Sequence, residues 1–197
     1  MLAPSPIRDA GHASRVLLAR IPIDVVELAA FGGRAANAAA VAARLGFPLP
    51  AHGRMARTPD GIALSVRPDR WLLLTSPAAP GVSVVRWQNA CAESAAATDL
   101  SSGLAARLLA GPAVREVLAR GCRLDLDPSV FGTGQTVTTI IAQVSVTLCA
   151  LSSGTFLLTP TSTSRHLDEW LAATATPFGL DRIAAQSFLD LIGVPTV

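Results

Sequence analysis

The stretch that decides the fold is Arg70-Trp71-Leu72-Leu73-Leu74-Thr75, a short apolar run that begins with a charged residue and a tryptophan. A similar run, Thr155-Phe156-Leu157-Leu158-Thr159, occurs in the second half of the chain, and the two runs are followed by Trp87 and Trp170. Apolar runs of this kind, bounded by turn residues, predict buried strands. Two copies in the same order predict a duplicated body.

The segments around these strands repeat as well. Phe31-Gly32-Gly33 precedes an alanine-rich helical stretch that ends at Gly46, and Ala110-Gly111-Pro112 precedes a helical stretch that ends at Gly121. Proline fits the first turn of a helix, and glycine after the last turn readily takes the left-handed cap conformation. The spacing of matching positions differs between the copies, so several small insertions separate them.

The fold class that this pattern predicts is α+β. Two pseudo-duplicated halves, each with a strand, a helix and a hairpin, form mainly antiparallel sheets with helices packed on them. We expect a single domain over residues 14–178, with similar halves at about residues 14–96 and 97–178. A chain of 197 residues is long enough for one sizeable core or two closely packed halves.

Other segments carry weaker signals. Residues 1–13 contain two prolines and a glycine, and we expect them to form a loose N-terminal arm. In the first half, a polar loop is expected before Thr58 and a helix over about residues 83–95. Residues 179–197 are expected to form a C-terminal tail that is helical over about residues 182–191.

The chain is poor in charge. Charged residues make up 15% of it and apolar residues 50%, whereas the usual charged share is about 25%. Two explanations stay open: alanine inflates the apolar count while burying little surface, or an apolar, charge-poor obligate interface remains exposed. The net charge is only +2 and the positive residues are scattered, so a nucleic-acid partner is not expected.

The sequence also bears on the compartment. It has no uninterrupted apolar run long enough for a membrane-spanning helix, and its N-terminus lacks the pattern of a signal peptide. Cys91, Cys122 and Cys149 are odd in number and far apart, which supports neither a disulfide framework nor a zinc site. We therefore expect a cytoplasmic protein with three reduced, buried thiols, no metal site and no membrane partner.

Few polar residues are grouped as a catalytic site would require. Asp125 and Asp127 flank one residue of an extended segment, so both carboxylates would lie on one side, yet acids before a proline are commonly solvated loop residues. The Asp99-Leu100-Ser101-Ser102-Gly103 segment is the most suggestive cluster, although Asp99 and Ser101 are equally typical of a turn that satisfies local backbone donors. The three histidines lie apart from cysteines and paired carboxylates.

The tryptophans are candidate anchors of a core or an interface. Trp87 and Trp170 occupy matching positions in the two halves, which favours packing between helix and sheet. Trp71 lies beside Arg67, Asp69 and Arg70, and a tryptophan flanked by charge can instead serve as a rim anchor on a partner surface. These four residues form the candidate partner interface, with core packing as the alternative for Trp71.

Four groups of residues together resemble a known family. They are Arg67 to Leu74; Asp99 to Gly103; Gly111-Pro112 with Val117 to Leu126; and His166-Leu167 with Trp170-Leu171. Their order and the chain length resemble the gamma subunit of heterotetrameric sarcosine oxidase over about residues 20–178. The resemblance implies the folate-binding fold of the glycine-cleavage T-protein, which agrees with the duplicated pattern.

The resemblance also implies a function. Such a complex oxidatively demethylates sarcosine to glycine and passes the one-carbon unit to tetrahydrofolate, with FAD, FMN and NAD held by other subunits. The gamma subunit is implied to be noncatalytic, to hold no cofactor of its own, and to bind the alpha, beta and delta subunits. Its mechanism would be association through an apolar, charge-poor face.

Departures from catalytic relatives leave the enzyme question open. The hairpin Ile141 to Val146 lacks the acid that active T-protein relatives carry, and the chain has no tyrosine, which the iron-sulfur-linked folate proteins of this fold have in their signature. The alternatives are a stand-alone folate-binding aminomethyltransferase-like protein, in which Asp99, Ser101 and Asp125 would bind the cofactor, and a homo-oligomeric ligand-binding module.

Overall fold

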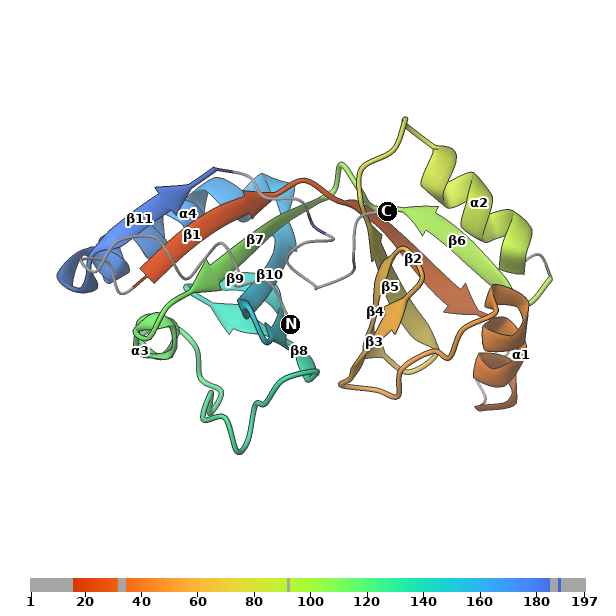
Figure 1. Cartoon of the computed structure of the whole chain (residues 1–197), viewed down its shortest axis with the longest axis horizontal. Helices are drawn as coiled ribbons and strands as arrows, with labels where there is room; N and C mark the ends of the chain where they lie inside the picture. Colours follow the sequence, from red (N-terminus) through yellow and green to blue (C-terminus); the bar gives the residue numbers. More distant parts are fainter. Residues whose placement is uncertain (1–15, 32–34, 92, 185–187, 189–197) are drawn as a thin grey trace, which may run out of the picture.

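Figure 1 shows the computed structural model of the chain, which describes residues 16–31, 35–91, 93–184 and 188. Two sheets face each other, and helices cover their outer sides (Figure 1). The predicted α+β class, with mainly antiparallel sheets, is confirmed. Among the described residues, no helix has the length and apolar character needed to cross a membrane.

The two sheets share one order over five strands, and β11 (Leu180–Ile183) is a sixth strand at one edge of the second sheet. The five-stranded sheet contains, from edge to edge, β3 (Met55–Thr58), β4 (Gly61–Arg67), β5 (Arg70–Thr75), β2 (Asp24–Ala30) and β6 (Ala95–Asp99). The six-stranded sheet contains β8 (Thr136–Ile141), β9 (Val144–Leu151), β10 (Gly154–Pro160), β7 (Leu104–Ala110), β1 (Val16–Ile21) and β11 (Leu180–Ile183). All neighbouring strands are antiparallel except β1 and β11. The helical elements are α1 (Ala35–Leu45), α2 (Val82–Cys91), α3 (Val114–Ala119), α4 (Ser164–Ala175), η2 (Thr161–Thr163) and η3 (Thr176–Phe178).

The duplication includes an exchange of strands. β1 pairs with β7 in the second sheet, and β6 pairs with β2 in the first, so each half contributes its first strand to the other half's sheet. The predicted halves, residues 14–96 and 97–178, therefore do not coincide with the two sheets, and their boundary falls inside β6. The residues of β1 are buried at Val16–Ala19, so the exchange helps to close the core.

The strand β5 explains why the quoted apolar run decides the fold. Trp71 and Leu73 face the helices of the first half, whereas Leu72 and Leu74 face the second sheet. Because side chains alternate along a strand, a run that is apolar at every position is buried on both faces. The cluster between the sheets also contains Phe156 of β10, the matching strand.

A direct backbone connection joins the two sheets where their outer strands begin. Met55 N–H donates to the Gly134 carbonyl oxygen at 2.8 Å, and Thr136 N–H donates to the Gly53 carbonyl oxygen at 2.9 Å. These bonds lie on either side of an antiparallel bridge between Arg54 and Gln135. Together with the apolar cluster between the sheets, they hold the two halves as one body.

Three expectations about local structure are wrong. The polar loop expected before Thr58 is the strand β3, which pairs with β4. The helix expected over residues 83–95 ends at Cys91, and Ala95–Asp99 is the strand β6. Alanine favours helices, but pairing with β2 holds β6 extended. The Gln88 side-chain amide also binds its outer edge, accepting from Ala97 N–H at 2.8 Å and donating to the Ala95 carbonyl oxygen at 3.3 Å.

The C-terminal segment is the third correction. The helix expected over residues 182–191 is wrong at its start, because Leu180–Ile183 pairs with β1 as the parallel strand β11. Strand pairing thus continues beyond residue 178. Phe188 is buried against Phe156, with ring centroids 5.9 Å apart. The arm at residues 1–13 lies outside the described residues.

Candidate functional site

A group of charged residues lies where the hairpin β4–β5 meets β2. Arg70 Nη1 lies 2.6 Å from Glu27 Oε1, and Arg67 Nη2 lies 3.8 Å from Glu27 Oε2. Asp69, at the tip of the hairpin, has a φ of 56°, which a non-glycine residue adopts mainly in tight turns. The hairpin therefore holds two guanidinium groups over one partly buried carboxylate.

This group borders a cleft of about 470 Å³ between the two sheets. One wall comes from β2, β4 and β5 and includes Glu27 and Arg67, and the other comes from β8, β9 and β10. The second wall carries hydroxyl groups, including those of Thr138 and Thr147, whose oxygens are 2.9 Å apart. Apolar side chains complete the lining: Val66, Leu72, Leu100, Leu104, Leu158 and Pro160.

The chemistry of this lining suits binding. Both oxygens of the Glu27 carboxylate face guanidinium groups. The remaining polar lining groups are hydroxyls and the guanidinium of Arg67, which bind acceptors and anions. Among the described residues, no group of three or more His, Cys, Asp or Glu side chains could hold a metal ion.

The Asp99 segment forms a local turn, which is the structural alternative that the sequence offered for this cluster. Asp99 is exposed at the end of β6, and its Oδ1 accepts from Ser101 N–H at 2.9 Å. Hydrogen bonds from Ser101 hold the pKa of the Asp99 carboxyl below its ordinary value. The Ser101 hydroxyl in turn accepts from Val25 N–H at 3.0 Å. Both side chains are used to fix the crossing from β6 to β7.

Asp125 is not brought to the same place. It is exposed on the loop after α3, where its Oδ1 accepts from Asp127 N–H at 2.9 Å. Asp127 repeats this turn with Ser129, whose hydrogen bonds lower the pKa of the Asp127 carboxyl. Ser101 lines a hollow beside β1 and β7, whereas Leu126, the neighbour of Asp125, lines a different hollow beside α3. The three residues of the alternative folate site are therefore not assembled around one of these hollows.

Trp71 is not the rim anchor that its charged neighbours suggested. Its side chain is buried, at 3% exposure, and its indole N–H donates to the Pro50 carbonyl oxygen at 3.0 Å. A side chain that is already enclosed within its own chain cannot also serve as an exposed anchor. Arg67 and Arg70 are exposed and Asp69 is partly exposed, and their role at an interface remains a prediction.

The cysteines are free and buried, as predicted. Burial raises the pKa of the Cys91 thiol, and it raises that of Cys149 to about 12, so these two thiols stay protonated near neutral pH. His52 is exposed, and the Nε2 of the exposed His166 lies 3.1 Å from the Ala142 carbonyl oxygen. His12 lies outside the described residues.

A buried ion pair was missed by the interpretation of the sequence. Arg107 of β7 and Asp168 of α4 are 3% and 5% exposed, and Arg107 binds the carboxylate through Nε to Oδ1 and through Nη2 to Oδ2, the latter at 3.0 Å. Arg20 of β1 adds a bond to Oδ2 at 2.8 Å. The one signal in the sequence was an arginine in the middle of the apolar strand Leu104–Ala110.

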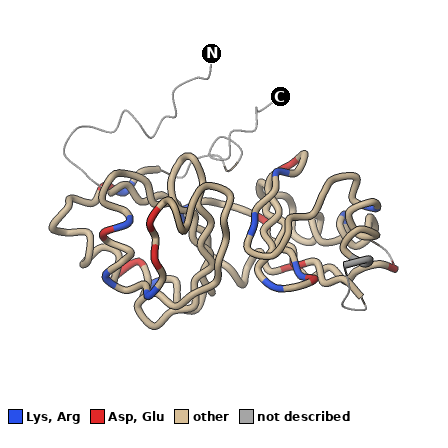
Figure 2. The backbone as a smooth tube through the Cα atoms, turned by 90° about the horizontal axis from the view of Figure 1, so that it is seen from below, with Lys and Arg blue, Asp and Glu red and all other residues tan. Residues whose placement is uncertain are grey.

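Burial and the two arginines shift the pKa of the Asp168 carboxyl in opposite directions. Burial alone would raise the pKa of the Asp168 carboxyl, but the hydrogen bonds and charges of Arg107 and Arg20 together outweigh it and hold the pKa below its ordinary value. The carboxylate is therefore ionised at neutral pH and ties β1, β7 and α4 together. Elsewhere, positive and negative residues are interspersed, and the described part of the chain shows no continuous stripe of one sign (Figure 2).

Two facing antiparallel sheets with one repeated strand order define the chain as a protein of T-protein-like fold. The aminomethyltransferase T of the glycine cleavage system from Bartonella henselae shares this fold, with a TM-score of 0.62 at 14% identity over 86% of this chain and 48% of that one. The model of the "Sarcosine oxidase, gamma subunit family" matches residues 31–175. The chain belongs to this family.

Individual relatives of this chain support the same family assignment. The chain is 30% identical over 152 residues to the sarcosine oxidase subunit gamma of Arthrobacter sp., covering 76% of this chain and 74% of the relative. It is 31% identical over 150 residues to the gamma subunit of Corynebacterium sp. strain U-96, covering 74% and 72%. A chain in the structure of heterotetrameric sarcosine oxidase from Corynebacterium sp. U-96, in complex with pyrrole 2-carboxylate, matches with a TM-score of 0.74 at 28% identity, over 91% of this chain and 93% of that chain.

Proposed function

We propose that this chain is the gamma subunit of a heterotetrameric sarcosine oxidase and that it acts by association, without a catalytic step of its own. The observation that carries the proposal is the agreement in family, length and fold with a chain of the Corynebacterium complex. The cleft between the sheets supports it, because the Glu27 carboxylate in its lining is paired with Arg70. In this proposal, the chain contributes a binding surface for the other subunits.

The partners in this proposal are the alpha, beta and delta subunits. The complex oxidatively demethylates sarcosine to glycine and passes the one-carbon unit to tetrahydrofolate, with FAD, FMN and NAD bound by the other subunits. The free, buried thiols agree with a reducing compartment such as the cytoplasm. In this proposal, the chain fixes the position of one partner against another.

Assembly tests this proposal directly. Co-expression with the other three subunits from the same source should give a stoichiometric complex on size-exclusion chromatography, whereas the chain expressed alone should self-associate or precipitate, because its docking face stays uncovered. A monodisperse chain that remains separate from the other subunits would contradict the proposal. Calorimetry of the isolated chain with tetrahydrofolate distinguishes the stand-alone aminomethyltransferase, since only that alternative requires binding.

The charged hairpin is the proposed rim of the interface. Arg67 is exposed and its contact with Glu27 is long, at 3.8 Å, so its charge is available to a partner and contributes little to folding. Arg67→Gln is expected to slow association with the other subunits on the order of a few-fold at low salt, with an unchanged unfolding curve. Arg44→Gln, an exposed change on α1, is the control. Equal association rates for both variants, measured by surface plasmon resonance, would remove Arg67 from the interface.

A further inference from the structure

The register of the two sheets places one residue of each half at the same position. Trp71 of β5 lies opposite Leu28 of β2, and Thr155 of β10 lies opposite Leu109 of β7. In both sheets this pair is on the face that the helices cover. The strand order is also the same, so Trp71 and Thr155 are structural counterparts. The first half has an indole where the second half has a small hydroxyl side chain.

The space around the two counterparts differs accordingly. In the first half, the indole of Trp71 is enclosed with Val41 of α1 and Phe47 of the following loop, and its N–H is bonded to Pro50 of the same loop. In the second half, the equivalent place beside Thr155 is a hollow of about 460 Å³. The hollow is open to solvent, and Thr155 itself is partly exposed. The small side chain of Thr155 therefore leaves open the space that corresponds to the enclosed indole of the first half.

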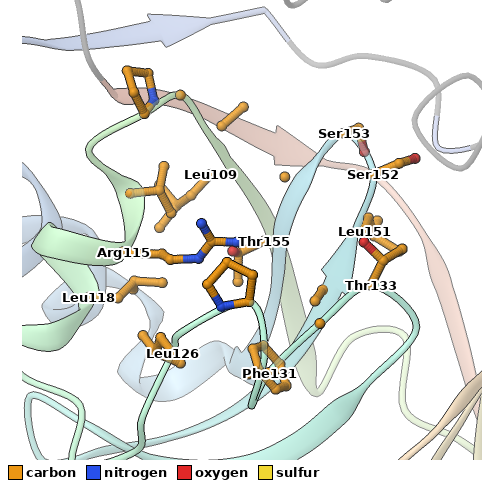
Figure 3. A pocket seen from close by; sticks show the side chains of 18 residues that line it. Leu109, Arg115, Leu118, Leu126, Phe131, Thr133, Leu151, Ser152, Ser153 and Thr155 are labelled. Carbon is orange, nitrogen blue, oxygen red and sulfur yellow. The ribbon is translucent and has the colours of Figure 1, made fainter.

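The lining of the hollow suits an aromatic guest. Leu109, Leu118 of α3, and Leu126 and Phe131 of the next loop form its apolar walls (Figure 3). The hydroxyl side chains of Thr133 and Ser152 lie at its other side, and Thr155 lies between the two sides (Figure 3). The lining is mixed, with apolar walls beside hydroxyl groups and a guanidinium. Such a lining can take an indole or phenol, which is apolar in its body and carries one polar group.

Arg115 supplies a charged group. Its side chain extends from α3 over the hollow, and the guanidinium lies beside Thr155 (Figure 3). A guanidinium above an aromatic ring is stabilised by the electrons of the ring face. The chain uses this contact twice elsewhere, with Arg86 4.5 Å from the ring centre of Trp87 and Arg120 4.8 Å from that of Phe178.

The given sequence offers few aromatic residues as a source of the guest. The sequence has six phenylalanines, three tryptophans and no tyrosine, and all nine aromatic residues are among the described ones. Among the described aromatic residues, only Phe31 is a largely exposed side chain, at 52%. Two candidate guests are thus Phe31 of a second copy and an aromatic residue of another subunit.

Resting on the proposed function as a subunit, we propose that this hollow receives an aromatic side chain, a tryptophan fitting best, from another subunit of the complex. The ring enters between Leu118 and Phe131, under the guanidinium of Arg115, and takes the place that Trp71 occupies in the first half. A buried aromatic anchor in a preformed pocket is typical of the residues that dominate binding at protein interfaces. This hollow is thus the centre of one docking surface.

The test fills the hollow from within. Thr155→Trp reproduces the arrangement of the first half and should raise the dissociation constant for the other subunits about 30-fold or more. Its thermal unfolding temperature should be equal or higher, because the indole fills existing space. Val85→Trp adds the same side chain to an exposed position of α2 and should leave both quantities unchanged. Arg115→Gln, an exposed change that does not endanger folding, should weaken assembly several-fold.

The possible outcomes separate the alternatives. Wild-type chain that fails to assemble with the other subunits overturns the proposed function and this inference together. Wild-type chain and Thr155→Trp that assemble equally well overturn only the inference. A photoreactive residue at Thr133 should crosslink to an aromatic residue of another subunit, whereas a crosslink to a second copy of this chain would overturn the partner assignment. Binding of N-acetyltryptophanamide by NMR with unimpaired assembly of Thr155→Trp would make the hollow a small-ligand site, contrary to the proposal.

Discussion

Replacing Asp168 by alanine is expected to lower the free energy of unfolding by about 3–5 kcal/mol. The change leaves the Arg107 guanidinium, 3% exposed, inside the fold without its carboxylate. A buried charge that has lost its partner keeps the free-energy penalty of desolvation, and no ion pair offsets this penalty. Urea denaturation at pH 7, followed by tryptophan fluorescence, measures the loss.

Two further variants control this experiment. Arg20 also bonds to Asp168, but its side chain is 70% exposed, so Arg20→Gln should cost less than about 1 kcal/mol. The double variant Arg107→Met, Asp168→Leu removes both buried charges and should be close to the wild-type stability. If Asp168→Ala unfolds at the same urea concentration as wild type, the ion pair is not a determinant of stability.

The same carboxylate gives a pH dependence with a definite sign. The two arginines hold the folded-state pKa of Asp168 below its unfolded value of about 3.9. Its contribution is therefore fully present above the unfolded pKa and is lost as the pH falls through the lower folded pKa. The stability difference between wild type and Asp168→Asn should be constant from pH 6 to 8 and should shrink below about pH 4. A difference that grows in acid would contradict this assignment.

Replacing Trp71 by alanine is expected to cost about 3–5 kcal/mol of unfolding free energy. The indole fills the space between β5 and the loop after α1, and its N–H satisfies the Pro50 carbonyl oxygen. The substitution removes both the apolar contacts and the donor. Urea denaturation of the purified variant measures the loss directly.

The comparison with phenylalanine separates the two contributions. Trp71→Phe keeps a ring in the core and loses the N–H donor, so the expected loss is smaller, about 1–3 kcal/mol. A rim anchor would behave in the opposite way: Trp71→Ala would leave unfolding unchanged and weaken only the binding of partners. That result would restore the interface role that burial of this side chain excludes.

The parts of the fold that the sequence predicted well are those with strong local signals. The hairpin β4–β5 follows from two apolar runs around the turn Arg67–Arg70, and α1 ends at Gly46, whose φ is 76°. The missed strand β6 has an alanine-rich start, where local propensity favours a helix and only the pairing with β2 makes it extended. β11 was missed for the same reason, since its four residues are held by β1.

The candidate sites show the same division. The turn formed by Asp99 and Ser101 was predictable because its hydrogen bonds join neighbours in the sequence. The Arg107–Asp168 pair was not, because its members are 61 residues apart and belong to different elements. The hollow beside Thr155 was also invisible in the sequence: a threonine in a strand is ordinary, and it becomes informative only when the register aligns it with Trp71.

By itself, the sequence determined the duplicated α+β pattern and the resemblance to a family of subunits, since turn residues, apolar runs and their order are local properties of the chain. Only the tertiary structure decided which half each exchanged strand joins, that Trp71 is enclosed, and that its counterpart Thr155 leaves a hollow. The physical reason is that burial and pairing depend on side chains from distant segments meeting, and the free energy of those contacts overrides local preference.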